Sequence, residues 1–167
     1  MNNVKREFDL YPPMCEWLTK VLEDKYKNQK CKITVVDAHA WSLDKVLTQY
    51  GIIYDYPQTV GLNIEIDVLG MVVWDNGKTE LHFIEAKKTP LNLHDLGQLI
   101  VYCSLVDPSD AYLLSSAGMG SLDKVLNNLG REDLLKFGDG KKIKSIKVAT
   151  WDVSRETVDQ YTIYPKI

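Results

Sequence analysis

Two extended runs joined by a tight turn constrain the fold of this chain more than any other feature. Within residues 64–87, β-branched and aromatic residues lead into Asp75-Asn76-Gly77, and a second largely apolar run follows. Asn-Gly between such runs is the strongest short-range signal for a β-hairpin. We therefore expect an antiparallel pair of strands here.

Three of the charged residues in this hairpin are candidates for a shared site. Asp67 lies in the first run, and Glu85 and Lys87 close the second. Because side chains alternate along a strand, Glu85 and Lys87 share one face and Ala86 points to the other. Two carboxylates brought together in apolar surroundings repel each other unless a cation or a proton joins them. Mg²⁺ is usually held by one or two carboxylates together with waters and phosphate oxygens, so the hairpin predicts a site for a hard divalent cation.

A resemblance to a known family starts from these residues. Asp67 followed by Glu85-Ala86-Lys87 at a strand end resembles the motif of the PD-(D/E)XK nuclease superfamily. Gln98-Leu99-Ile100-Val101-Tyr102 resembles the Gln-x-x-x-Tyr helix that follows the catalytic strand in one branch of that superfamily. The resemblance implies a divalent-metal-dependent nuclease that hydrolyses phosphodiester bonds, with DNA as the expected nucleic acid and Mg²⁺ or Mn²⁺ as the cofactor.

The resemblance also implies roles for individual residues. Asp67, Glu85 and the carbonyl of Ala86 would bind the metal, and Lys87 would assist the attacking water. The chain departs from the family pattern at Ile66, where the name of the superfamily has proline.

Further site residues are expected on two helices. Gln98 and Tyr102 lie one turn apart on a helix that Asn92 can cap, and the resemblance implies that they support the site and the phosphate. Many relatives in that superfamily supply another carboxylate from the first helix, which makes Glu16 the candidate additional ligand. The alternative for Glu16 is a surface acid that pairs with Lys20 one turn later.

Alternative interpretations exist for the site and for the function. Asp67 and Glu85 can be exposed strand residues that pair with lysines. The net charge of −3 is unusual for a protein that binds nucleic acids. The alternative function is therefore a non-catalytic binding or assembly module on the nuclease fold. Lys87-Lys88 and the run 141–147 are the available basic patches, although lysines of that run can equally mark a solvated edge strand.

The order of predicted elements indicates an α/β fold with a mixed central β-sheet flanked by helices. The resemblance implies the same architecture, a restriction-endonuclease-like core. The resemblance covers roughly residues 10–116. Pro12 and Pro13 stand where a first helix can begin, and apolar residues recur at helical spacing to Tyr26. The remaining predictions are strands at 32–40, 110–116 and 143–153, helices at 41–50 and 122–129, an aromatic loop at 51–61 and an edge piece at 161–164.

Length and composition indicate one domain spanning residues 1–167. Apolar residues make up 45% of the chain and charged residues 26%, which are ordinary globular values. No run reaches the length of a membrane span, and the first ten residues lack the apolar core of a signal peptide, so we expect a cytosolic protein that does not bind membranes. Cuts on the two antiparallel strands of a duplex are naturally made by two-fold related sites, which is compatible with a homodimer.

Overall fold

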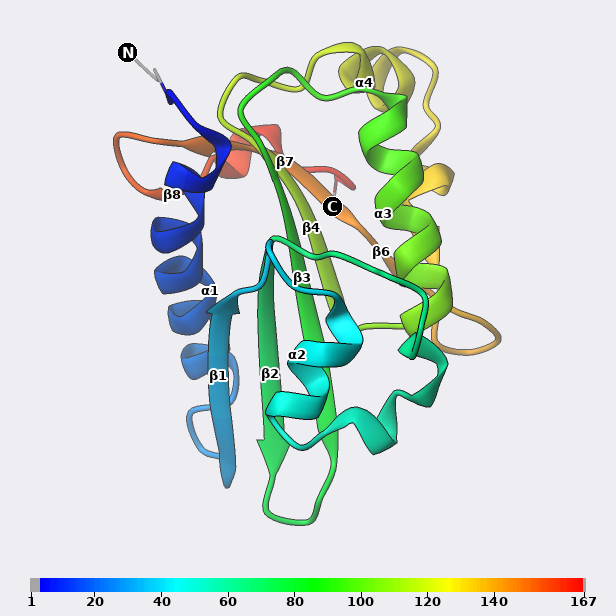
Figure 1. Cartoon of the computed structure of the whole chain (residues 1–167). Coiled ribbons are helices and arrows are strands. Elements are labelled where there is room, and N and C mark those ends of the chain that lie inside the picture. The colour runs from blue at the N-terminus through cyan, green and yellow to red at the C-terminus, as the bar shows by residue number, and fades with distance from the viewer. Residues whose placement is uncertain (1–3, 167) are drawn as a thin grey trace.

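The computed structural model describes residues 4–166 and shows a mixed six-stranded sheet with helices on both faces (Figure 1). The strand order is β1-β2-β3-β4-β7-β8. The expected α/β fold with a mixed central sheet is therefore confirmed. The strands are β1 Cys31–Asp37, β2 Val68–Trp74, β3 Thr79–Lys87, β4 Asp110–Ser115, β7 Lys147–Asp152 and β8 Thr157–Val158; a separate two-stranded sheet consists of β5 Lys136–Phe137 and β6 Lys144–Ser145. The α-helices are α1 Tyr11–Lys25, α2 Leu43–Gln49, α3 Leu93–Val106 and α4 Ser121–Asp123.

The predicted hairpin supplies two inner strands of the sheet. β2 and β3 pair antiparallel, with Val68 opposite Ile84. The backbone N–H of Trp74 donates to the carbonyl of Lys78 at 2.9 Å, which encloses a loop of Asp75, Asn76 and Gly77. Gly77 has a φ of 90°, a backbone conformation that residues with a side chain rarely adopt, so the Asn-Gly pair placed the turn correctly.

The crossover through α3 brings β4 parallel to β3, with Glu85 opposite Leu113. The side chain of Asn92 accepts a hydrogen bond from the backbone N–H of Asp95 at 3.0 Å, and the Asp95 carboxylate accepts one from the N–H of Asn92 at 3.1 Å. This reciprocal capping box fixes the start of α3. The predicted cap at Asn92 is thus confirmed.

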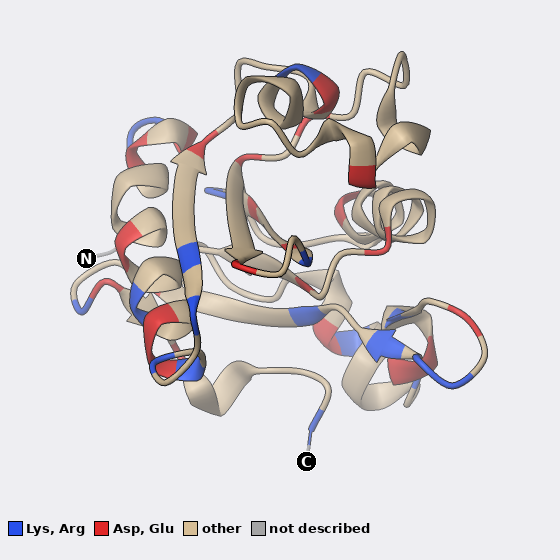
Figure 2. Ribbon diagram, turned by 90° about the horizontal axis from the view of Figure 1, so that it is seen from below, with Lys and Arg blue, Asp and Glu red and all other residues tan. Residues whose placement is uncertain are grey.

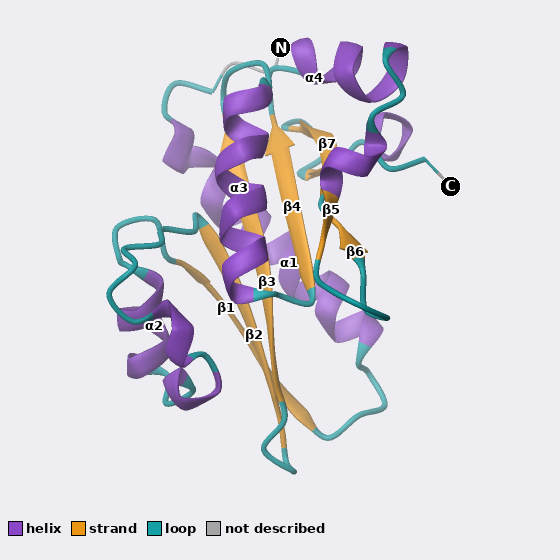
Figure 3. Cartoon of the chain, turned by 90° about the vertical axis from the view of Figure 1, so that its right-hand side faces the viewer, coloured by secondary structure: helices purple, strands orange, loops and turns teal. Residues whose placement is uncertain are grey.

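Two apolar layers fill the space between the sheet and its helices. α1 lies on one face and α3 on the other, with α2 beside the hairpin (Figure 3). α1 approaches the sheet closely at Gly70, where a Cβ would lie 3.1 Å from methyl carbons of Leu18 and Leu22. Glycine at this strand position therefore lets the helix lie directly on the sheet.

Two predicted elements differ in the structure. The strand expected at 143–153 is divided, because Lys144–Ser145 pairs with β5 while Lys147–Asp152 pairs with β4. The helix expected at 122–129 is α-helical only over Ser121–Asp123 and continues as a π-helical turn over Lys124–Asn128. The predicted edge piece meets β7 through an antiparallel bridge between Tyr164 and Val148.

Charges of both signs are distributed over the surface. In the view of Figure 2, lysine and arginine positions are mixed with aspartate and glutamate positions along the helices and loops. Among residues 4–166, none of the helices combines the length and the apolar character that a membrane span requires.

Candidate functional site

Asp67 and Glu85 lie side by side at one end of the hairpin. Asp67 immediately precedes β2, and its carboxylate oxygen Oδ2 accepts a hydrogen bond from the backbone N–H of Ala86 at 2.8 Å. In return, the backbone N–H of Asp67 donates to Oε1 of Glu85 at 3.3 Å. Glu85 is buried, with 7% of its surface exposed, while Asp67 is partly exposed. The structure therefore brings together the two carboxylates that the sequence singled out.

The end of the strand ladder explains this arrangement. The pairing of β2 with β3 ends at Val68 and Ile84, so the N–H of Ala86 has no strand partner there and bonds to the Asp67 side chain instead. The N–H and C=O of one residue in a strand point in the same direction. The carbonyl of Ala86 is therefore directed to the side on which Asp67 stands.

Both carboxyl groups have a raised pKa. Burial is the main cause for Glu85, and the neighbouring charge of Asp67 raises its pKa further. Burial also raises the pKa of Asp67, against the opposing effect of hydrogen bonds from the N–H of Ala86 and the hydroxyl of Tyr11. Like-charged groups in a low-dielectric site favour a proton or a cation between them. The raised pKa means that this pair holds its protons to higher pH than free carboxyl groups do.

Lys87 supplies the nearest positive charge. It lowers the pKa of both Asp67 and Glu85, and its side chain is 23% exposed. The ammonium Nζ lies 4.0 Å from Oδ1 of Asp95, the partner of Asn92 in the capping box of α3. Lys87 is therefore shared between the start of α3 and the electrostatic environment of the acidic pair.

Gln98 and Tyr102 follow Asp95 along one face of α3, at positions i+3 and i+7. Nε2 of Gln98 donates to the hydroxyl of Tyr102 at 3.2 Å. Gln98 is exposed, whereas Tyr102 packs partly against the core. The structure joins these two residues to each other, and their hydrogen bond does not extend to Asp67 or Glu85.

The N-terminal segment contributes Glu7 and Tyr11, which sequence reasoning missed. The hydroxyl of Tyr11 donates to Oδ1 of Asp67 at 3.1 Å, and the charge of Glu7 raises the pKa of both Asp67 and Glu85. Glu16 lies five residues after Tyr11, about 140° around the helix, on the exposed face of α1. The fold therefore brings Glu7, rather than Glu16, close to the acidic pair.

The donor set fits a hard cation that keeps part of its hydration. No cluster of three or more histidine, cysteine, aspartate or glutamate side chains with metal-binding geometry occurs within residues 4–166. Two carboxylates and one backbone carbonyl are nevertheless the oxygen donors that Mg²⁺ commonly takes from a protein, with waters and substrate completing its coordination. The pKa of both carboxyl groups is raised chiefly by burial, and the charge of Lys87 offsets only part of that effect.

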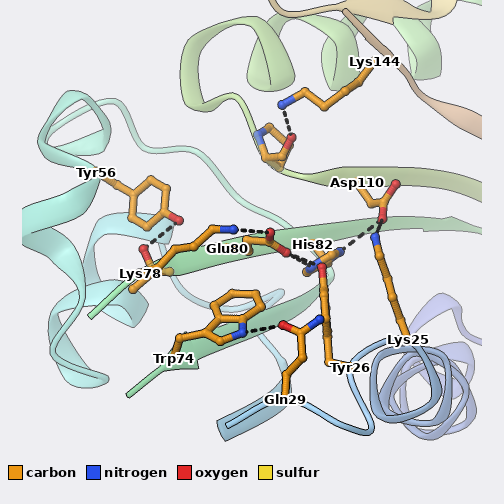
Figure 4. A network of polar contacts seen from close by, with 12 residues as sticks. Lys25, Tyr26, Gln29, Tyr56, Trp74, Lys78, Glu80, His82, Asp110 and Lys144 are labelled. Carbon is orange, nitrogen blue, oxygen red and sulfur yellow. Dashed lines mark hydrogen bonds and ion pairs between the residues drawn. The ribbon is translucent and has the colours of Figure 1, made fainter. Parts of the chain in front are cut away.

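A second polar cluster lies under α1, away from this pair (Figure 4). His82 is fully buried, and its ring nitrogens each lie 3.4 Å from a carboxylate oxygen, one of Glu80 and one of Asp110. Lys25 and Lys147 face Asp110 at 3.6 and 3.0 Å. Because cations already surround these acids, we interpret the cluster as structural.

The basic run 141–147 is also partly used by the fold. Nζ of Lys144 lies 2.7 Å from Asp107, and Nζ of Lys147 lies 3.0 Å from Asp110. These contacts favour the structural interpretation of these two lysines over a free nucleic-acid patch.

Comparison of the chain with protein-family models, with curated proteins and with solved structures found no match.

Proposed function

We propose that this protein is a divalent-metal-dependent nuclease that hydrolyses phosphodiester bonds, with DNA as the expected substrate. The observation that carries the proposal is the juxtaposition of Asp67 and Glu85, two carboxyl groups with raised pKa, beside Lys87 on the same strand end. Perturbed acids in one place with a fixed cation next to them are typical of functional sites.

Asp67, Glu85 and the Ala86 carbonyl would hold the metal. A bound Mg²⁺ polarises phosphoryl oxygens and lowers the pKa of a coordinated water. Lys87 would place a positive charge where the negative charge of a pentavalent phosphorus develops, and such stabilisation is strongest for a group that is already fixed in position. Oδ1 of Asp95, 4.0 Å from Nζ of Lys87, would help to orient this side chain.

The resemblance to PD-(D/E)XK nucleases supports the same assignment. Its motif residues occur on a strand hairpin followed by a helix, as the family pattern requires. Gln98 and Tyr102, on the face of α3 that begins with Asp95, would contact the phosphate or brace Lys87.

The test is a cleavage assay on single-stranded, duplex and branched DNA and on RNA, with Mg²⁺, Mn²⁺ or a chelator. Glu85→Gln should abolish cleavage, whereas Glu23→Gln, at an exposed position on α1, should leave the rate unchanged. Mg²⁺ should also raise the thermal midpoint of the unmodified protein but not of Glu85→Gln, since a ligand stabilises only the state that binds it. Equal cleavage by the unmodified protein and Glu85→Gln would show that the site is misassigned.

A binding or assembly module is the second candidate, and the net charge of −3 favours it. Such a module has no need of a metal. Absence of cleavage for every substrate, together with no thermal response to Mg²⁺ or Mn²⁺, would select this alternative.

A further inference from the structure

Aromatic rings extend from the acidic pair to the surface at the N-terminal end of α1. Tyr11, whose hydroxyl contacts Asp67, packs against His39 with ring centroids 4.9 Å apart. His39 lies nearly parallel to Phe8, with an interplanar angle of 8° and a centroid separation of 6.4 Å. The ring series Tyr11, His39 and Phe8 therefore leads directly away from a candidate metal ligand.

The two outer rings are open to solvent. Phe8 is 44% exposed, and the side chain of His39 is 42% exposed. Asp37 anchors His39 through contacts to its backbone N–H and its ring nitrogen Nδ1. The exposed Phe8 ring therefore contrasts with the ring of Tyr11 behind it, which is only 4% exposed.

Charges of both signs surround the exposed rings. Asp37 pairs with His39, Asp9 pairs with Arg6, and Glu7 accepts a hydrogen bond from the backbone N–H of Lys88. The guanidinium of Arg6 lies over the ring of Phe8 at 4.3 Å from its centroid and also pairs with Asp9. Lys88, at the end of β3, donates from Nζ to the backbone carbonyl of Lys5 at 2.9 Å, so a second cationic residue joins the N-terminal segment. A ligand that presents flat rings together with phosphates would replace the contacts that Arg6 makes with Phe8 and Asp9.

We propose that Phe8 and His39 form a stacking platform for an unpaired base of a single-stranded nucleic acid, with Arg6 and Lys88 facing the adjacent phosphates. The proposal rests on the nuclease function proposed above and specifies its substrate as a strand with unpaired bases next to the scissile bond. Aromatic side chains beside a cationic groove are the usual means of binding single strands, because every base offers a flat face. Paired bases of a duplex do not expose that face.

Binding of a fluorescein-labelled oligothymidylate to the full chain, followed by anisotropy without divalent metal, tests the platform. Phe8→Leu keeps an apolar side chain but removes the ring, and we expect its dissociation constant to rise about 5- to 100-fold. Tyr161→Leu removes an equally large ring that is 93% exposed elsewhere, and its affinity should not change. Thermal melting of both variants verifies that each is folded.

An abasic oligonucleotide of the same length separates stacking from charge. Its affinity should be the same for the unmodified protein and for Phe8→Leu, whereas Arg6→Gln should weaken both oligonucleotides. Unchanged oligothymidylate binding by Phe8→Leu, an equal loss for the abasic strand, or no binding by the unmodified protein would overturn the platform.

These outcomes are distinct from failure of the nuclease proposal. Cleavage of duplex DNA without single-strand binding would overturn the platform alone. Ring-dependent binding of oligothymidylate without any metal-dependent cleavage would overturn the nuclease function and leave the platform in place.

Discussion

Replacing Glu85 with glutamine is expected to abolish cleavage and to stabilise the folded protein at any pH where Glu85 is ionised. The substitution keeps the shape of the side chain, and glutamine Oε1 can still accept the hydrogen bond that the backbone N–H of Asp67 donates at 3.3 Å. What it removes is a buried negative charge beside that of Asp67. Sites built for chemistry commonly give up stability in this way.

The magnitude follows from the charges around the pair. Two like charges about 4 to 6 Å apart repel by about 3 to 4 kcal/mol at an effective dielectric constant of about 20. Attraction to Lys87 offsets part of this repulsion. We therefore expect the free energy of unfolding to rise by about 1 to 3 kcal/mol, which corresponds to roughly 2 to 4 °C in thermal midpoint per kcal/mol for a chain of this size.

The increase in the free energy of unfolding of Glu85→Gln should depend on pH. The pKa of Glu85 is raised in the folded state, so the folded protein holds its proton to higher pH than the unfolded chain does. Stability of the unmodified protein is therefore lost as pH rises from the ordinary carboxyl range through the raised pKa. The advantage of Glu85→Gln should be small near about pH 4 and complete once the pH exceeds the raised pKa of Glu85.

Urea unfolding at several pH values, with a chelator present, measures this difference. Glu23→Gln is the matched control, because its glutamate is exposed on α1 and the substitution should change stability little at any pH. A destabilised Glu85→Gln at alkaline pH, or a gain that is the same at every pH, would refute the argument that this charge is uncompensated.

Three other substitutions test neighbouring contacts. Tyr11→Phe removes the hydroxyl that lowers the pKa of Asp67, so the acid limb of the pH–rate profile should move to higher pH; an unmoved limb would show that this hydrogen bond does not tune the site. Asn92→Ala removes the cap of α3 and should cost about 1 kcal/mol in urea unfolding, and an unchanged midpoint would contradict the capping role. Gly70→Ala places a Cβ 3.1 Å from α1 side chains and should cost about 1 to 3 kcal/mol, whereas a neutral result would mean that α1 can shift away from the sheet.

Local signals predicted the hairpin and the strand part of the site. The Asn76-Gly77 pair marks its own turn, and the two-residue period of a strand is enough to place Glu85 and Lys87 on one face. The cap at Asn92 is equally local, because its partner Asp95 lies three residues away. Such features are readable from sequence because the residues that determine them are adjacent in the chain.

Contacts with the N-terminal segment could not be predicted from the sequence in the same way. Tyr11 meets Asp67 across 56 residues, and Glu7 reaches the pair only because α1 docks on the sheet. The rotation of α1 was nevertheless encoded, since Tyr11 and Leu18 are seven residues apart and share the buried face. The same rotation of α1 directs Glu16 toward solvent. Its position therefore does not support the prediction that Glu16 adds a carboxylate to the metal site.

The hydrogen bond between Tyr11 and Asp67 also determines when, during synthesis of the chain, the site can assemble. A ribosome releases the N-terminal segment well before the hairpin, so the acidic pair and Tyr11 meet only after β3 has been synthesised. A chain that ends before β3 therefore lacks the assembled site. Conversely, proteolytic removal of the segment that precedes α1 would take away Glu7 and the exposed ring of Phe8 while sparing the central strands, so that trimming could alter the site without dismantling the sheet.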